Sequence, residues 1–272
     1  AAGLIFRFGI IIIHLDHLMF DRFKTRSYEL ENIDTGTYTP AEYEGCLIEL
    51  RRVNRWMGDS RTLAQTLFRS VEVEGLSNFS VLDVGAGSGE LLRVTADWAR
   101  DTKRTFSGVG LELNQRSVES IRDESKGYAE VAAVRGDALR LPFADNSFDY
   151  AICSLFTHHF REPEIIRILE EMARLAQRKI FVIDLHRHPI AYLLYTTLGK
   201  LVLHTRLLRE DGALSILKSF NKQELKTLGE TAKLEELSVE RYFPFRLVLS
   251  GSRNRSGSTE MKLDTAAVDR AA

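Results

Sequence analysis

The chain has 272 residues, of which 44% are hydrophobic and 28% are charged, and its formal net charge is −1. This length allows one large α/β domain with an added helical segment, or two small domains. A charge so close to zero gives no indication of nucleic acid as a partner. The two cysteines, Cys46 and Cys153, belong to no metal-binding or redox pattern, so we expect a reducing, cytoplasmic environment and no metal site.

The N-terminal part divides into an apolar extension over residues 1–18 and a helical cap over residues 19–79. The apolar run within the extension is too short to cross a membrane as a helix, so stable membrane insertion is not expected. The extension is interpreted as upstream sequence translated in error or as a mobile segment, with a membrane-surface anchor as the alternative. Thr39 followed by Pro40 predicts a helix start, because Thr is a good N-cap and Pro fits the first helical turn. A second helix is expected from Ser60.

A glycine-rich turn follows the first predicted strand. The strand ends near Asp83 and leads to Gly85, Gly87 and Gly89, and a helix is expected from Glu90. Strand, glycine turn and helix together form the geometry in which a doubly wound sheet receives a nucleotide-like ligand. The spacing departs from the dinucleotide pattern, and the two carboxylates suit a ligand that carries positive charge rather than a pyrophosphate.

Two further predicted strands end in residues suited to ligand binding. Glu112 closes the second strand, where a carboxylate can accept hydrogen bonds from both hydroxyls of a ribose. Ser154 and Leu155 close the fourth strand at the carboxyl edge of the sheet. His158 and His159 follow and are the best general-base candidates, because imidazole titrates near neutral pH. At least one of the two is expected to be structural.

Several of these motifs resemble those of class I S-adenosylmethionine-dependent methyltransferases that act on small molecules. The run from Asp83 to Gly89 is similar to their first motif, and Gly136-Asp137-Ala138 with Leu141-Pro142-Phe143 is similar to a later one. The stretch 141–150 resembles enzymes that modify quinones and phenols. The resemblance covers residues 80–250. The cofactor-binding residues that it implies are Asp83, Gly85, Ala86, Gly87, Gly89, Glu112, Leu113, Asp137, Ala138, Ser154 and Leu155.

The resemblance also implies a fold and a cofactor. The fold is an α/β, Rossmann-like doubly wound seven-stranded mostly parallel sheet, with an antiparallel C-terminal hairpin and an N-terminal helical cap. The cofactor is S-adenosyl-L-methionine, and the product is S-adenosyl-L-homocysteine. Asp137 is implied to accept the adenine amine beside the Ala138 backbone N–H, and an Asp that caps a turn is the alternative.

The implied reaction is methyl transfer to a small-molecule acceptor, with His158 and His159 as catalytic candidates. O-methylation of an aromatic or polyketide-like acceptor is favoured, and C-methylation of a quinone precursor is the alternative. The alternative of another class is a module that binds the cofactor without catalysis. No nucleic-acid partner is expected, and a homodimer is a possibility.

The last third of the chain contains an unusually apolar helix over residues 190–204. It is interpreted as a substrate lid, with a buried core helix or a dimer face as equal alternatives. Residues 206–211 are expected to form a charged loop that ends in a turn at Gly212. Residues 251–272 are expected to be a disordered tail.

Overall fold

The computed structural model describes residues 21–56 and 58–253. The expected extension over residues 1–18 therefore lies outside the described residues, as does the expected tail from residue 254 onward. Residues 251 and 252 continue the last strand, so the methyltransferase-like region extends two residues beyond its expected end at 250. No helix among the described residues is both long and apolar enough to cross a membrane.

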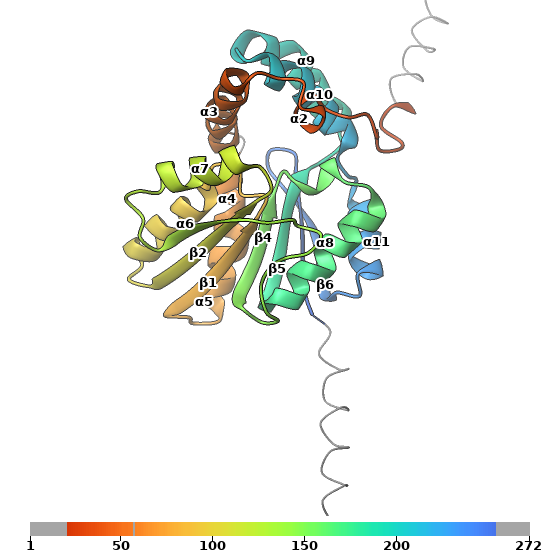
Figure 1. Ribbon diagram of the computed structural model, residues 1–272. Helices are drawn as coiled ribbons and strands as arrows, with labels where there is room; N and C mark the ends of the chain where they lie inside the picture. The colour runs from red at the N-terminus through yellow and green to blue at the C-terminus, as the bar shows by residue number, and fades with distance from the viewer. Residues whose placement is uncertain (1–20, 57, 254–272) are drawn as a thin grey trace, which may run out of the picture.

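One seven-stranded sheet forms the centre of the molecule (Figure 1). Its order is β3-β2-β1-β4-β5-β7-β6, with parallel pairing from β3 to β5 and antiparallel pairing of β7 with both β5 and β6. This confirms the predicted sheet, including its antiparallel C-terminal hairpin. The strands are β1 (Asn78–Val84), β2 (Thr105–Glu112), β3 (Val131–Arg135), β4 (Phe148–Ser154), β5 (Ala176–Leu185), β6 (Glu235–Tyr242) and β7 (Arg246–Ser252).

Helices cover both faces of the sheet because successive strand side chains point to opposite faces. Val81 packs in one apolar cluster, and the neighbouring Leu82 packs in the other. The first cluster lies under the helices α4 (Asp59–Leu63), η1 (Ala64–Phe68), α5 (Arg69–Val73) and α6 (Glu90–Asp101). The second lies under α8 (Glu162–Leu175) and α11 (Lys222–Thr231). The helix α7 (Gln115–Glu124) contacts β2 and β3.

A separate layer of helices lies beyond the carboxyl ends of the parallel strands (Figure 1). It contains α2 (Asn32–Thr35), α3 (Pro40–Trp56), α9 (Pro189–Val202) and α10 (Arg206–Lys218). The helix α10 contacts the other three helices. We call these four helices the cap layer. It draws on two parts of the chain that are far apart in sequence, the N-terminal region and the connection from β5 to α11.

The prediction of a charged loop at residues 206–211 is wrong, because these residues begin α10. Asp211 is buried within this helix and accepts hydrogen bonds from the backbone N–H groups of Asn32 and Ile33, at 3.0 and 3.1 Å. These bonds connect α10 to the start of α2. A contact between segments about 180 residues apart thus overrides the local turn preference of Asp211 and Gly212.

Candidate functional site

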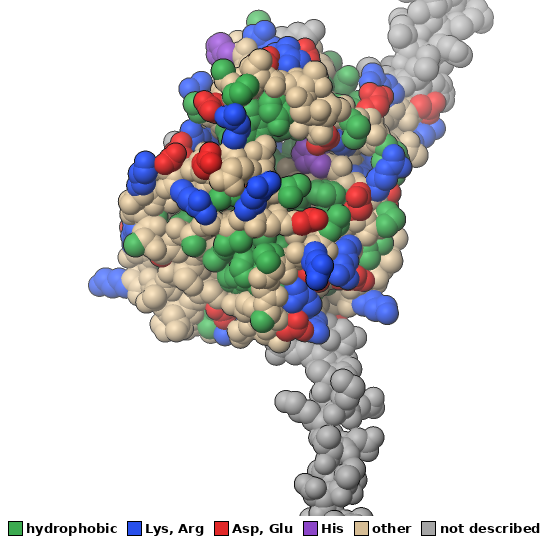
Figure 2. Space-filling model, in the orientation of Figure 1, with side chains coloured by type: hydrophobic (Ala, Val, Ile, Leu, Met, Phe, Trp, Pro, Cys, Tyr) green, Lys and Arg blue, Asp and Glu red, His purple; other side chains and the backbone are tan. Residues whose placement is uncertain are grey.

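A cavity of about 740 Å³ lies between the carboxyl ends of the strands and the cap layer. Figure 2 shows a hollow at this junction. The volume falls within the roughly 300–1,000 Å³ that is usual for small-molecule sites. Its sheet side includes Asp83, Gly87 and Glu112, and its cap side includes Tyr38 and Leu50. The cavity therefore joins the region predicted to bind a cofactor to a second, largely apolar region.

The glycine turn forms one wall of this cavity. The backbone N–H groups of Gly85 and Ala86 donate to the Leu111 carbonyl oxygen at 2.9 and 3.3 Å, which fixes the turn against β2. Gly85 has a φ of 71°, and a Cβ atom there would lie 2.3 Å from the Phe156 ring, so a side chain is excluded on both grounds. Gly89 does not line the cavity but precedes α6 as its N-cap.

Gly87 sits where the turn faces open space. Its φ is 58°, and no heavy atom lies within 4 Å of the position that a Cβ atom would occupy. Its N–H donates to Oε1 of Glu112 at 2.7 Å, so the turn and the end of β2 are held together. Because Gly87 has no side chain, a ligand can approach the backbone closely here, next to the Glu112 carboxylate.

Two carboxylates face the cavity near the ends of β1 and β2, the buried Asp83 and the partly buried Glu112. Asp83 is 2% exposed, and none of the described residues donates a hydrogen bond to its carboxylate. Burial raises the pKa of Asp83 to about 8, and the charge of Glu112 adds to this shift. Burial also raises the pKa of Glu112 to about 7, against the opposing effect of the Gly87 and Leu113 backbone N–H groups.

Keeping both carboxylates ionised costs free energy when no ligand is bound. A buried carboxylate that lacks a partner disfavours its charged form. A cation beside Asp83 and hydroxyl groups beside Glu112 would relieve that cost. S-adenosylmethionine carries an ammonium group, a sulfonium and a ribose diol, so the donor and acceptor set of these residues fits it.

The remaining predicted cofactor residues divide into two groups. Leu113, Ser154 and Leu155 line the cavity. Leu113 is 64% exposed and presents an apolar surface suited to an aromatic ring, while the Ser154 hydroxyl is buried and has no hydrogen-bond partner among the described residues. Leu155 has an unusual positive φ of 51°, and such backbone conformations gather at functional sites.

Asp137 and Ala138 do not line the cavity. Oδ1 of Asp137 accepts a hydrogen bond from the Leu139 N–H at 2.9 Å, so this residue caps its own turn, as the alternative interpretation held. Ala138 is buried in the core. Their role at the adenine edge stays a prediction.

The two histidines have different surroundings. His158 is 3% exposed and does not line the cavity, and its Nδ1 lies 2.7 Å from Oδ1 of Asp184. Burial alone would raise the pKa of Asp184, but its contacts with His158 and Thr157 outweigh this effect and lower it to about 2. The geometry therefore gives His158 a structural role.

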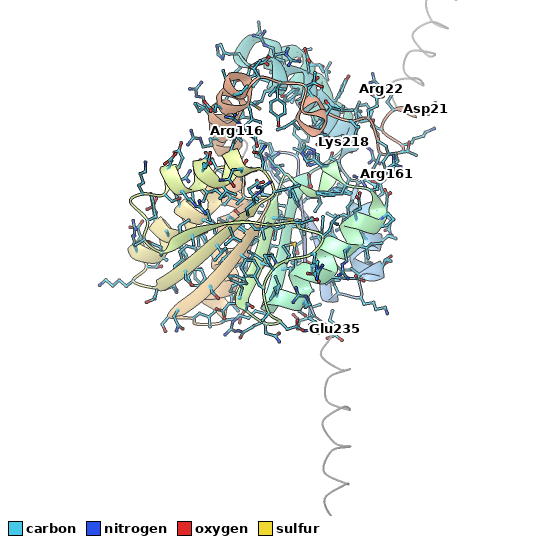
Figure 3. The ribbon with its side chains drawn as sticks, viewed as in Figure 1. Asp21, Arg22, Arg116, Arg161, Lys218 and Glu235 are labelled. Atoms are coloured by element: carbon cyan, nitrogen blue, oxygen red, sulfur yellow. The ribbon has the colours of Figure 1, made fainter. Side chains whose placement is uncertain are left out.

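His159 does line the cavity. Its Nδ1 lies 2.9 Å from Oδ1 of Asp34, a residue of α2 in the cap layer. Burial lowers the pKa of His159, but the hydrogen bond that its ring donates to the Asp34 carboxylate and the charge of Glu31 outweigh this effect, so the net shift is upward. Oδ2 of Asp34 is paired with the Lys218 ammonium at 2.8 Å (Figure 3 labels Lys218 at the junction of the cap layer and the sheet).

The cap layer adds site residues that the sequence did not identify. Asp34 and Tyr43 both line the cavity, and the Tyr43 hydroxyl lies 2.7 Å from Oγ of Ser117 on α7. Asp59 also lines it and accepts a hydrogen bond from Nε of the buried Arg246 at 2.6 Å. None of these residues belongs to a recognisable motif, and only the general position of a helical cap pointed toward them.

Three side chains that could bind a metal lie close together, although the sequence predicted no metal site. Ligand atoms of Glu31, His158 and His159 lie within 4.8 Å of one another. However, the Lys218 ammonium already lies 3.2 Å from Oε1 of Glu31. A divalent ion beside this buried ammonium would meet strong repulsion, so the cluster fits a bound proton and a lysine better than a metal.

Comparisons with known proteins agree with this geometry. Residues 81–179 match the family described as a methyltransferase domain. A stretch of 98 residues is 32% identical to a demethylmenaquinone methyltransferase of Bacillus licheniformis and covers 36% of this chain and 40% of that protein. A stretch of 117 residues is 34% identical to methyltransferase GfsG of Streptomyces halstedii and covers 42% of this chain and 38% of that protein.

A solved structure shares the fold. The magnesium protoporphyrin IX methyltransferase of Synechocystis, crystallised with S-adenosylhomocysteine, superimposes with a TM-score of 0.51 at 14% identity, over 72% of this chain and 84% of that one. The two curated relatives above are matched over well under two thirds of their own length, at 40% and 38%. The family match covers the sheet from β1 to the start of β5.

Proposed function

We propose, from the premise that residues 81–179 form a class I S-adenosylmethionine-dependent methyltransferase domain, that this chain transfers the methyl group of that cofactor to a small hydroxylated acceptor. The four helices of the cap layer would enclose the acceptor. The cap was predicted over residues 19–79, but residues 59–73 of that range pack on a face of the sheet. Two parts of the cavity then have separate tasks, with the cofactor on the sheet side and the acceptor on the cap side.

The observation that carries this proposal is the pair of carboxylates beside the glycine turn, the buried Asp83 and the partly buried Glu112. Asp83 would hold the ammonium group of the cofactor, and Glu112 would accept hydrogen bonds from its ribose hydroxyls. Leu113 would pack on the adenine ring, with Ser154 and Leu155 completing the wall. When bound, the cofactor supplies a methyl group that is activated by an adjacent sulfonium.

The acceptor side combines apolar walls with one titratable group. Phe156 and Phe160 lie edge to face with ring centroids 4.9 Å apart, and both line the cavity with His159. His159, held by Asp34 through Nδ1, would take a proton from the acceptor hydroxyl through its other nitrogen, Nε2. The protein would otherwise act by positioning the acceptor and excluding water.

O-methylation of an aromatic or polyketide-like hydroxyl is our first candidate, and C-methylation of a reduced quinone is the second. The second is favoured by the similarity to demethylmenaquinone methyltransferases. Both candidates begin with the same deprotonated aromatic hydroxyl, since the resulting charge can react at oxygen or at the adjacent ring carbon. The residues around His159 are therefore compatible with either product.

Calorimetric titration of S-adenosylmethionine and S-adenosylhomocysteine, with NAD as the control, tests the cofactor. We expect micromolar binding of the first two, about −8 kcal/mol, and no binding of NAD. Binding of NAD instead would refute the proposal. A screen of phenols and hydroquinones with isotopically labelled methyl donor would then test the reaction, and NMR of the product separates an O-methyl from a C-methyl group. Cofactor binding without turnover of any acceptor would support a non-catalytic binding module.

A further inference from the structure

The outer face of α9 is an unpartnered apolar surface. Six large hydrophobic side chains of this helix are between 43% and 81% exposed, which is half of the exposed large hydrophobic residues in the described chain. Their spacing of three and four residues places them on one face of the helix. Thr197 is the exposed polar residue among them. We call this surface the α9 face; it consists of Ile190, Leu193, Leu194, Leu198, Leu201 and Val202.

The opposite side of α9 is firmly held, so the exposure does not reflect a loosely attached helix. Ala191 is buried, and Leu203 just beyond the helix packs with Cys46 and Leu207 of the cap layer. The Tyr195 hydroxyl donates to the Leu208 carbonyl oxygen on α10. The helix α9 itself lies on the side of the cap layer remote from the sheet (Figure 1). Its exposed side chains therefore belong to a helix that is packed on its other side.

The stretch of sequence that carries the α9 face is positively charged. Residues 185–209 contain four Lys or Arg and no Asp or Glu, although the chain as a whole has 38 acidic residues. Arg187 and Arg206 within this stretch pair with acidic residues from elsewhere. Arg209 is exposed and donates to the Leu203 carbonyl oxygen, with no acidic partner among the described residues. Glu49 and Glu210 also lie close to the end of α9, and they are bonded to His204 and Arg206. An apolar strip with exposed cations that lack an acidic partner beside it is typical of a helix that lies on an anionic lipid surface.

The first described residues of the chain contact the same helix. The Phe23 ring packs edge to face on the Tyr192 ring of α9, with centroids 5.6 Å apart. The Arg22 guanidinium lies 5.5 Å from the centre of the Tyr192 ring. Figure 3 labels Asp21 and Arg22 at the edge of the cap layer, where the described chain begins. The sequence before them includes the apolar run of residues 4–13.

We propose that the α9 face docks this protein on the surface of an anionic membrane. Its apolar side chains would enter the boundary between headgroups and acyl chains, while Arg22 and Arg209 would lie near the lipid phosphates. The helix would lie along the surface, since it has 14 residues and none of the described helices can cross a membrane. The cap layer that carries it also covers the cavity, so docking brings the site near the lipid. This inference concerns a surface and does not depend on methyl transfer.

Flotation of the full chain with lipid vesicles tests the proposal. The probes are vesicles of phosphatidylcholine alone and vesicles of phosphatidylcholine and phosphatidylglycerol in about equal parts. The variant is Leu198→Glu with Leu201→Glu, which changes two exposed positions. The matched control is Val73→Glu, which changes an exposed apolar residue at the end of α5, away from the cap layer. Circular dichroism confirms that each variant is folded.

We expect the unmodified chain and the Val73→Glu control to float with the anionic vesicles, and less so at high salt. The α9 variant should lose at least about tenfold in apparent vesicle affinity. Equal flotation of the α9 variant would overturn the proposal, because another segment would then be the anchor. Absence of flotation by the unmodified chain would also overturn it. If that chain instead sediments as a dimer and the α9 variant as a monomer, the face is an interface between two copies.

Discussion

Nδ1 of His159 lies 2.9 Å from Oδ1 of Asp34. The imidazole that we propose as the general base follows a strand of the sheet, but a residue of the cap layer orients it. The same carboxylate binds the Lys218 ammonium of α10 through its other oxygen. Burial raises the pKa of Asp34, but His159 and Lys218 outweigh that effect and lower it. Asp34 is therefore charged at neutral pH and stabilises the protonated form of His159.

Replacing His159 by Gln should lower kcat by about 10²–10⁴-fold and leave the cofactor Kd within about twofold, because a proton acceptor is lost while the cofactor wall is kept. Steady-state rates and calorimetry on the same preparation measure the two effects. Full activity of His159→Gln would remove it from catalysis. His158→Gln is the comparison, and it should chiefly lower the melting temperature, because its buried contact with Asp184 is worth about 1–3 kcal/mol.

Replacing Asp34 by Asn should move the pH dependence of kcat to lower pH. The Asp34 carboxylate raises the pKa of His159, so its removal lets the imidazole lose its proton at lower pH and become a competent base earlier. The charges that continue to face His159 are Glu31 and Lys218, which act in opposite directions. Rates measured across the pH range at saturating cofactor would show the shift. A profile unchanged in position would contradict a role of Asp34 in setting this pKa.

Replacing Glu112 by Gln should weaken binding of S-adenosylhomocysteine by about 2 kcal/mol, since the ribose hydroxyls lose a charged acceptor. The Gly87 N–H can still donate to the amide oxygen of Gln, which helps to preserve the turn. Glu119→Gln, on the exposed surface of α7, is the matched control and should bind normally. Equal affinity of the two variants would exclude Glu112 from the cofactor site.

Replacing Asp83 by Asn should stabilise the ligand-free protein and weaken cofactor binding. The pKa of Asp83 is raised from 3.8 to about 8 on folding, so the unfolded state releases this proton first, and stability is lost as pH rises through that window. Glu112 contributes in the same direction up to about pH 7. The free energy of unfolding of the variant should be higher by on the order of a few kcal/mol at the upper end of this pH window, and it should depend less on pH than that of the unmodified protein. Urea unfolding at several pH values checks this, and a variant that is less stable at every pH would contradict it.

Replacing Gly85 by Ala should destabilise the fold by more than about 2 kcal/mol, because strain at positive φ adds to a collision with Phe156. Gly36→Ala separates these two causes, since Gly36 has a similar φ of 70° and open space around its Cβ position. That control should cost only about 1 kcal/mol. Urea unfolding of both variants gives the comparison, and equal losses would mean that contact with Phe156 contributes nothing.

The sequence predicted the features that depend on short, contiguous patterns. The sheet, the glycine turn and Glu112 follow from apolar runs bounded by glycines and acids, and each comes from fewer than ten consecutive residues. Asp34, Tyr43 and Asp59 could not be found in this way. Their importance arises from contacts with residues 74 to 187 positions away, and no local spacing encodes such a contact.

The roles of His158 and His159 likewise depend on long-range contacts that the sequence does not reveal. Two adjacent imidazoles were predicted to differ in role, and the sequence could not assign the roles because both follow the same strand. The assignment depends on which carboxylate each ring meets. His158 contacts Asp184 of β5 and is buried in the core, whereas His159 contacts Asp34 of α2 and lines the cavity.

The position of β7 between β5 and β6 has a consequence for synthesis of the protein. Until residues 246–252 have been made, β5 has no partner on that side, and its backbone N–H and C=O groups are open to pairing with another chain. Arg246, which neutralises the buried Asp59 of α4, arrives with the same strand. Asp59 therefore has no Arg246 counter-charge until one of the last strands has been synthesised. Protection of the nascent chain by a chaperone would matter most during that interval.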